Sequence, residues 1–158
     1  MQARRLIERG VALAKGRLLA RILNVYPPYL GAGVRVRELD ALTFEVSMAL
    51  RPWNRNYFGT HFGGSLYSMC DPFFALILAR ALGPDYVVWD KAATIRFRKP
   101  GKGRVSAHFA IAAERVEQIR AEAASSRKLE PTFQAEVRDE AGAVVAEVDK
   151  HLYVRKTR

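Results

Sequence analysis

Apolar residues alternate with polar or small residues along much of the chain, which is the pattern of β-strands that bury one face. The alternation predicts strands at about residues 34–37, 42–50, 87–97, 105–111, 133–137 and 144–154, the last two forming a hairpin around 139–142. The side chains expected to face the core are Val34, Val36, Leu42, Phe44, Val46, Met48, Leu50, Val87, Trp89, Ala93, Ile95, Phe97, Val105, Ala107, Phe109, Ile111, Phe133, Ala135, Val137, Val144, Ala146, Val148, Leu152 and Val154.

Three other stretches follow the helical period, in which apolar residues recur every three or four positions. Residues 1–24 are predicted to form an amphipathic helix that packs across the edge of the domain, with docking on a membrane surface as the alternative. Its apolar stripe consists of Ile7, Val11, Ala14, Leu18 and Ile22. A helix at about 62–82 is apolar over most of its circumference, which is typical of a helix wrapped by other elements. A short surface helix is expected at 114–126.

The order of these elements is helix, two strands, buried helix and about four further strands. One long central helix wrapped by an antiparallel sheet of five to six strands is the natural α+β arrangement for this order. A chain of 158 residues is the right length for one core, so we expect an N-terminal helix (1–24) packed on a single domain (25–158). No apolar run approaches the 18 or so residues that span a bilayer, and stable membrane insertion is not expected.

Positive charge is concentrated in three places. The formal net charge is +10; residues 1–24 supply half of it, and further basic clusters lie at 96–104 and 155–158. Such a surface attracts nucleic acid, anionic lipid or a small polyanion such as coenzyme A, and charge alone does not distinguish them. No zinc-finger spacing, RNP-like aromatic motif or helix-turn-helix accompanies the charge, so a nucleic-acid partner is not expected.

Cys70 is the only cysteine, which excludes an internal disulfide and most cysteine-based metal sites. The three histidines lie far apart with no carboxylate at ligand spacing, and a metal is therefore not expected. A reducing cytoplasm fits this cysteine usage. The N-terminus lacks the features of a secretory signal, whereas its arginine-rich, acid-poor start leaves a mitochondrial transit peptide as an alternative.

Gly63 and Gly64 stand at the predicted start of the central helix, behind a polar loop at 54–60. Without side chains they let a ligand approach backbone N–H groups closely, and at a helix start those groups are unpaired and carry positive potential. Such donors stabilise a developing oxyanion. The alternative is that the two glycines only permit a tight entry turn.

Asp71 is the second candidate, because a carboxylate amid an apolar helix is costly unless it is paired or functional. Pro72 follows it and disfavours helical geometry there, and its missing N–H leaves the Ser68 carbonyl without its helical partner. The pattern is compatible with a distorted helix at an active-site carboxylate. It is equally compatible with Asp71 capping a second helix that starts at Pro72.

Gly63 and Asp71 are eight residues apart, or roughly 12 Å along one helix. Reacting groups must come within about 3–3.5 Å of one another, so one helix cannot offer both to a single substrate carbonyl. Two antiparallel copies can, each giving its glycines to one site and its aspartate to the other. A catalytic role therefore predicts a two-fold dimer with two shared sites.

The Gly63-Gly64-x6-Asp71 pattern, after a loop with asparagine and histidine and before a long apolar helix, is similar to the phenylacetate-pathway type of hot-dog-fold thioesterases. More closely, residues 62–78 together with the run 88–93 resemble an uncharacterised hot-dog branch, the domain of unknown function 4442. The resemblance covers roughly residues 25–155. In the better-known thioesterases a histidine directly precedes the two glycines, whereas here Phe62 intervenes after His61.

The resemblance implies a hot-dog-fold dimer, or dimer of dimers, that hydrolyses acyl-coenzyme A without a metal or redox cofactor. Asp71 would act as nucleophile or general base, and the Gly63 and Gly64 amides would hold the thioester oxygen. Asn56 would orient water or substrate, and His61 is a further candidate. The residues expected to bind substrate, with the basic ones meeting the coenzyme A phosphates at the dimer rim, are Phe62, Ser65, Tyr67, Arg96 and Arg98.

The rival function is a non-catalytic acyl-coenzyme A or fatty-acyl binding module of the same fold. A hydratase or dehydratase is a weaker third option, because the sequence has no Asp-x4-His pair. Asp90 and Lys91 fall on opposite faces of a predicted strand, so one of them should point inward, either in a buried ion pair or in the site. His108 and His151 lie on predicted strands and are expected to be surface or packing residues.

Overall fold

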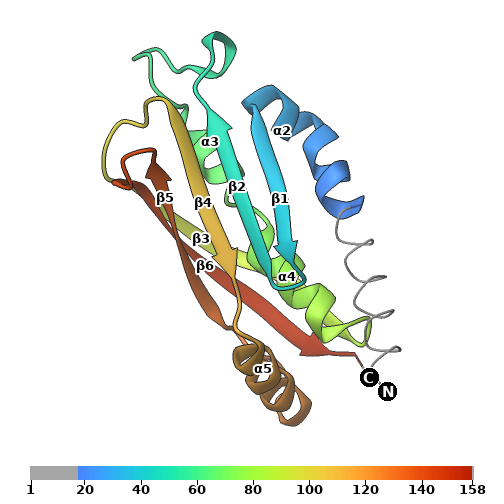
Figure 1. Ribbon diagram of the computed structural model, residues 1–158. Helices are drawn as coiled ribbons and strands as arrows, with labels where there is room; N and C mark the ends of the chain where they lie inside the picture. The colour runs from blue at the N-terminus through green and yellow to red at the C-terminus, as the bar shows by residue number, and fades with distance from the viewer. Residues whose placement is uncertain (1–17, 158) are drawn as a thin grey trace.

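The computed structural model describes residues 18–157, whose strands form one six-stranded antiparallel sheet in the order β1-β2-β4-β5-β6-β3. The strands are β1 (Val34–Asp40), β2 (Thr43–Ala49), β3 (Tyr86–Phe97), β4 (Arg104–Ala110), β5 (Thr132–Asp139) and β6 (Val144–Lys156). Beyond a helix at 18–25, the helices are α2 (Pro27–Ala32), the 3₁₀ turn η1 (Pro52–Asn54), α3 (Gly63–Ser68), α4 (Phe73–Leu82) and α5 (Ala113–Ser125). The sheet wraps around α3 and α4, which lie on one of its faces, and this confirms the α+β prediction (Figure 1).

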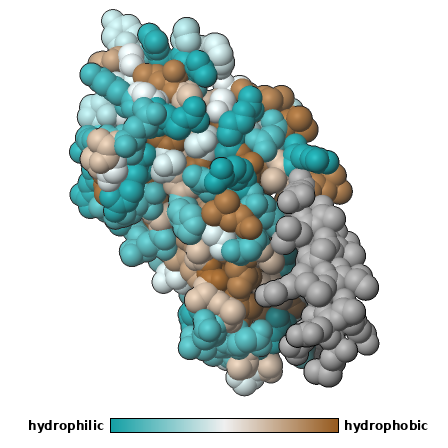
Figure 2. Space-filling view, in the orientation of Figure 1, coloured by the Kyte–Doolittle hydropathy of each residue, from teal (hydrophilic) through white to brown (hydrophobic). Residues whose placement is uncertain are grey.

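The core fills the space between α4 and the inner face of the sheet. Strands β2, β4 and β5 bury alternate residues, as the sequence pattern predicts. At the centre is Phe73 of α4, whose ring lies 4.9 Å from that of Phe109 and 5.4 Å from that of Phe44, centroid to centroid. The opposite face of the sheet is mainly hydrophilic (Figure 2), so the sheet has one buried and one solvated side, as antiparallel sheets commonly do.

Strand β3 departs from the predicted alternation. Its pairing with β6 shifts register between Asp90 and Ala92, where Lys91 is an extra residue. Such a bulge reverses which positions face the core. The expectation that Ile95 packs inward is confirmed, but the expectation for Trp89 is wrong: before the bulge, Val88 packs on the core and Trp89 is exposed.

The helix at 18–25 packs on the domain through a face other than the predicted one. Leu18 and Ile22, the two positions of the predicted stripe that the structure describes, are exposed. Ala20 is buried instead, and Leu19 and Leu23 pack against the core. The rest of the predicted N-terminal helix lies outside the described residues.

The predicted continuous helix at 62–82 is divided into α3 and α4 by a non-helical segment at 69–72. Since Pro72 has no N–H to offer the Ser68 carbonyl, the N–H of Asp71 donates to that carbonyl instead, at 3.2 Å. The second helix begins at Phe73, and no side chain caps it, so Asp71 is free of the capping role. Although 63–82 is long and apolar enough to compare with a membrane span, this break and the enclosing sheet identify it as a core element.

Candidate active site

Asp71 lies in the break between α3 and α4, where its carboxylate meets a buried lysine. Lys150 Nζ donates a hydrogen bond to Asp71 Oδ1 at 2.6 Å. The Lys150 side chain is 0% exposed, whereas that of Asp71 is 42% exposed. The Tyr29 hydroxyl also donates to the Asp71 backbone carbonyl and fixes the chain at this point. One carboxylate oxygen is therefore held by the protein while the side chain as a whole still reaches solvent.

Lys150 is a site residue that the sequence reading missed. It lies on the inner face of β6 between Val148 and Leu152, both of which are buried. The signal was present, because a lysine interrupts an alternating apolar row at a position that the strand period turns toward the core. A charged residue there has to be paired.

Asp90 is a second carboxylate paired with the same ammonium. Its Oδ1 lies 3.0 Å from Lys150 Nζ, in an ion pair without hydrogen-bond geometry. Burial raises the pKa of Asp90; Lys150 lowers it only in part, and the neighbouring charge of Asp71 raises it further. The expected inward-facing ion pair is thus formed by Asp90, whereas Lys91 points outward and pairs with Glu130 at 2.7 Å.

The pKa of Lys150 lies above its usual range. Burial by itself lowers it, but the hydrogen bond to Asp71 and the charges of Asp71 and Asp90 more than compensate, so the ammonium stays charged. Burial also raises the pKa of the Cys70 thiol to about 12, with the Lys150 charge opposing the shift. The thiol therefore remains protonated near neutral pH and is a poor nucleophile.

Gly63 and Gly64 open α3 with backbone N–H groups that donate no hydrogen bond to another described residue. Both glycines are needed for close packing. A Cβ on Gly63 would lie 2.9 Å from Cζ of Phe97, and one on Gly64 would lie 2.5 Å from Cε1 of Phe62. Since both rings are on exposed side chains, they can move aside, and the amides are available to a ligand.

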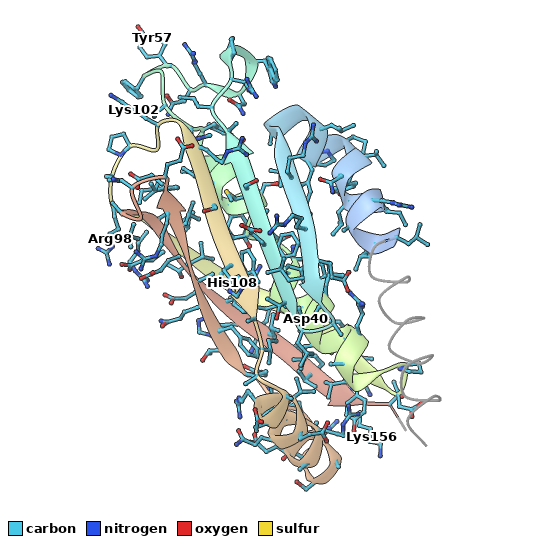
Figure 3. The ribbon with its side chains drawn as sticks, in the orientation of Figure 1. Asp40, Tyr57, Arg98, Lys102, His108 and Lys156 are labelled. Carbon is cyan, nitrogen blue, oxygen red and sulfur yellow. The ribbon has the colours of Figure 1, made fainter. Side chains whose placement is uncertain are left out.

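A cleft of about 720 Å³ borders Gly63 at the end of the sheet where the 98–102 loop meets the 56–61 loop. Figure 3 shows Tyr57 and Lys102 at this end of the molecule, with Arg98 farther down the same side. The cleft is lined by Asn56, Phe58, Thr60, His61, Gly63, Leu66, Phe97, Arg98, Lys99, Pro100, Gly101 and Lys102. Its walls are largely apolar and its rim is basic, which suits a ligand with an apolar body and an anionic end.

Asp71 does not line this cleft. The six residues of α3 by themselves separate Gly63 from the segment that carries Asp71 by about 9 Å. One chain therefore keeps the two groups apart even though the central helix is broken. The geometric reason for expecting a shared site is unchanged.

Asn56 and His61 hold the loop that borders the cleft. The Asn56 amide donates to Thr60 Oγ1 (2.9 Å) and to the His61 carbonyl (3.1 Å), and its Oδ1 accepts from the N–H groups of Phe58 and Thr60. His61 is buried, and its Nε2 donates to the Gly103 carbonyl at 3.0 Å. The hydrogen bonds of both side chains thus stabilise the loops.

Protonation of His61 is expected to destabilise the fold. Burial lowers its pKa, the Gly103 carbonyl opposes this in part, and its Nδ1 has no partner among the described residues. A lowered pKa means that stability present above the unfolded-state value of about 6.5 is lost as the pH falls, by up to about 1 kcal/mol per pH unit. Urea unfolding at pH 7.5 and 5.5 should show a larger drop for the wild type than for His61→Gln. An equal drop, or one removed instead by the exposed control His108→Gln, would contradict this.

The five predicted substrate-binding residues are divided among four places. Phe62 and Ser65 line a separate groove between α2, η1 and α3. Tyr67 belongs to the buried cluster, with its hydroxyl 3.2 Å from Lys150 Nζ. Arg98 lines the cleft and also pairs with Glu147. Arg96 lies outside the cleft, in ion pairs with residues of β6, because the strand turns it away from the core.

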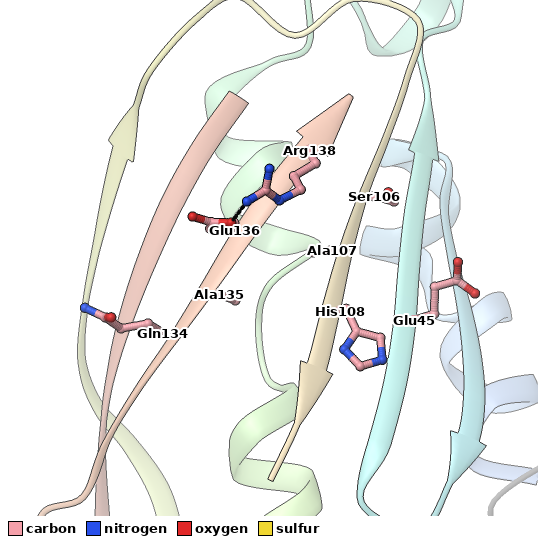
Figure 4. A pocket seen from close by; sticks show the side chains of 8 residues that line it. All are labelled: Glu45, Ser106, Ala107, His108, Gln134, Ala135, Glu136 and Arg138. Carbon is pink, nitrogen blue, oxygen red and sulfur yellow. Dashed lines mark hydrogen bonds and ion pairs between the residues drawn. The ribbon is translucent and has the colours of Figure 1, made fainter. Parts of the chain in front are cut away.

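A hollow of about 440 Å³ on the outer face of the sheet is unrelated to these groups. It opens where β4 and β5 diverge beyond their last paired residues, Ala107 and Val137. Figure 4 shows its polar and charged lining, including His108 and the ion pair of Arg138 with Glu136. None of the predicted site residues borders it.

A family model described as a domain of unknown function (DUF4442) matches residues 15–154. The chain belongs to this family. No curated protein matches the sequence. The DUF4442 match confirms the resemblance inferred from residues 62–78 and 88–93.

Several solved structures share the fold. A protein of unknown function from Pseudomonas aeruginosa, described as a probable thioesterase, is 27% identical, with a TM-score of 0.79 over 89% of this chain and 95% of that one. A thioesterase from Haemophilus influenzae is 16% identical, with a TM-score of 0.65 over 87% and 88% of the two chains. The E. coli PaaI protein of the phenylacetic acid degradation operon is 14% identical, with a TM-score of 0.61 over 95% and 96%. These likenesses confirm the hot-dog fold.

Proposed function

We propose that this protein hydrolyses acyl thioesters of the coenzyme A type. The observation that carries the proposal is the Asp71 carboxylate, which is fixed through one oxygen by a fully buried lysine yet remains open to solvent. A buried charge held in this way is costly to build, and stability alone is a weak reason to keep it. The basic rim of the cleft suits the phosphates of coenzyme A, and the apolar wall suits an acyl chain.

Hydrolysis of a thioester requires little more than these groups. The carboxylate of Asp71 takes a proton from water while the water oxygen adds to the thioester carbon. The Gly63 and Gly64 amides stabilise the negative charge that develops on the carbonyl oxygen. The C–S bond then breaks, and the thiolate leaves without a dedicated acid because it is a good leaving group. Direct attack by the Asp71 carboxylate, followed by hydrolysis of the anhydride, is the alternative route.

The proposed site is shared by two copies of the chain. Strand β3 is an edge of the sheet, and its outer side is unpaired within residues 18–157. A twelve-residue edge with exposed Trp89 and Phe97 is a surface that proteins usually cover. Two-fold pairing of β3 with its copy runs the two α3 helices in opposite directions, so that the Gly63 end of one faces the Asp71 end of the other.

A panel of acyl-coenzyme A substrates with detection of the free thiol tests the function. We expect turnover by the full-length protein, and a loss of about 10²-fold in kcat for Gly63→Pro, which removes one proposed oxyanion donor. Proline is tolerated at the first position of a helix, which is where Gly63 lies. Gly63→Ala is the matched control, because it adds the same Cβ against Phe97 but keeps the N–H. Equal activity of the two variants would contradict the assigned role.

The alternative is a non-catalytic module that binds acyl-coenzyme A. The Asn56 side chain favours it, because both its amide group and its Oδ1 are engaged in loop hydrogen bonds. In that case an acyl-coenzyme A would raise the melting temperature in a saturable way while no thiol is released.

A further inference from the structure

The buried cluster at Lys150 holds one ammonium between two carboxylates. Asp71 comes from the break between α3 and α4, Asp90 from the edge strand β3, and Lys150 from β6. When both aspartates are ionised, the cluster therefore has a net charge of −1. A single acid would be enough to neutralise the lysine in a structural ion pair. The second acid therefore indicates a further role for the cluster.

The two carboxylates are held unequally. Asp71 receives a hydrogen bond of 2.6 Å, whereas Asp90 makes an ion pair of 3.0 Å that lacks hydrogen-bond geometry. Asp71 is also the more exposed of the two, with side-chain exposures of 42% and 24%. The ammonium is thus nearer to Asp71, the more exposed acid, while the less exposed Asp90 can still accept a hydrogen bond from it.

Three other titratable groups lie near the ammonium, namely Tyr67, Cys70 and Tyr29. The Tyr67 hydroxyl lies 3.2 Å from Lys150 Nζ, and its ring centroid lies 5.2 Å away. The Cys70 thiol and the Tyr29 hydroxyl stay protonated because burial raises the pKa of each. The neighbours of Lys150 on its own strand, Asp149 and His151, project from the opposite face of β6. Charge in the cluster is therefore governed by the two aspartates and the lysine.

We propose that Lys150 is a positioning residue for Asp71, and that Asp90 is a second acceptor toward which its ammonium shifts when Asp71 becomes protonated. The proposal rests on the proposed hydrolysis, because it assigns these residues to the same site. With Oδ1 bound to Lys150, the free Oδ2 of Asp71 faces the attacking water. When Oδ2 takes the proton of that water, the attraction of Asp71 for Lys150 falls, and Asp90 keeps the ammonium, with all three of its protons, paired.

Two single variants and their combination test this assignment. Lys150→Met removes the ammonium at similar volume and leaves two carboxylates together, so the acidic limb of the kcat/KM profile should move to higher pH by about one unit or more. In Asp90→Asn the Lys150 ammonium pairs with Asp71 alone, so the acidic limb of the kcat/KM profile should move to lower pH. In the double variant Asp71 has neither the ammonium nor the second carboxylate beside it. Its acidic limb should lie between those of the two single variants. Lys128→Met, which removes an exposed lysine paired with Glu130, is the control and should leave the limb unchanged.

A second readout does not depend on turnover. In the full-length chain with ¹³C-labelled aspartate, the two carboxyl carbons of the wild-type pair should titrate in two coupled steps. The midpoint of the Asp71 carboxyl carbon should move to higher pH in Lys150→Met and to lower pH in Asp90→Asn, where it is the one carboxyl left of the pair. If Lys150 had only a structural role, its replacement would lower stability in urea, and the two single variants would not move this midpoint in opposite directions.

The two proposals fail in different ways. If the wild type releases no thiol from any substrate while the carboxyl titrations shift as described, the hydrolase proposal is wrong and the coupling of Lys150 with the two acids stands. If the wild type is active but both single variants keep the wild-type acidic limb and carboxyl midpoints, the positioning role of Lys150 is overturned. Shifts of both single variants in the same direction would overturn it as well.

Discussion

Asp71→Asn is expected to lower kcat for acyl-thioester hydrolysis by about 10²- to 10⁴-fold, the usual contribution of a positioned general base. Asparagine keeps the size of the side chain and an oxygen that accepts from Lys150, so the break between α3 and α4 should persist. The measurement is kcat with the free-thiol assay, together with the urea midpoint of the same preparation. Full activity in Asp71→Asn would contradict the mechanism proposed for this chain.

Mixing two inactive variants extends the same test to the shared site. Co-expressed Asp71→Asn and Gly63→Pro chains form hybrid dimers in which one site receives both substitutions and the other receives neither. Random assembly should restore about a quarter of the wild-type activity. A mixture no more active than its parents would place each site within one chain, and a monomer in solution would exclude the shared arrangement.

Phe73→Ala is expected to cost about 3–5 kcal/mol of unfolding free energy. The Phe73 side chain is fully buried and lies against the rings of Phe44 and Phe109, so its removal leaves a cavity between α4 and the sheet. Urea unfolding should show a lower midpoint with an unchanged slope. Phe58→Ala is the matched control, since that ring is 84% exposed and its loss should stay within about 0.5 kcal/mol. Similar losses in the two variants would contradict this account of the core.

Much of the fold could be predicted because its strands bury one face each. The alternation in β2, β4 and β5 is unbroken, and the structure buries the predicted residues. The errors fall where a local irregularity changes the period. One extra residue at Lys91 reversed the faces of β3 in a way that composition does not reveal. Pro72 signalled a disturbance, but a distorted helix and two separate helices obey the same local rules.

The candidate site was predictable to the extent that its residues break local rules. Gly63, Gly64 and Asp71 stand out in sequence because glycines and a carboxylate are unusual in an apolar helix, and their catalytic roles remain predictions. Lys150 breaks the rule for its strand just as clearly, yet its partners lie 79 and 60 positions away, and only the folded chain brings them together. Asn56 and His61 were expected from resemblance, and the structure uses their hydrogen bonds to shape the loops.

The burial of Lys150 also constrains how this sequence can change over evolutionary time. An aliphatic residue in place of Lys150 would match its neighbours Val148 and Leu152 and remove the cost of desolvating the ammonium. It would also leave Asp71 and Asp90 without a counter-ion. As long as either acid is present, substitutions of Lys150 by an uncharged residue are disfavoured. We expect the three positions to be inherited together, so that relatives with an apolar residue at position 150 have lost both acids and, with them, the chemistry.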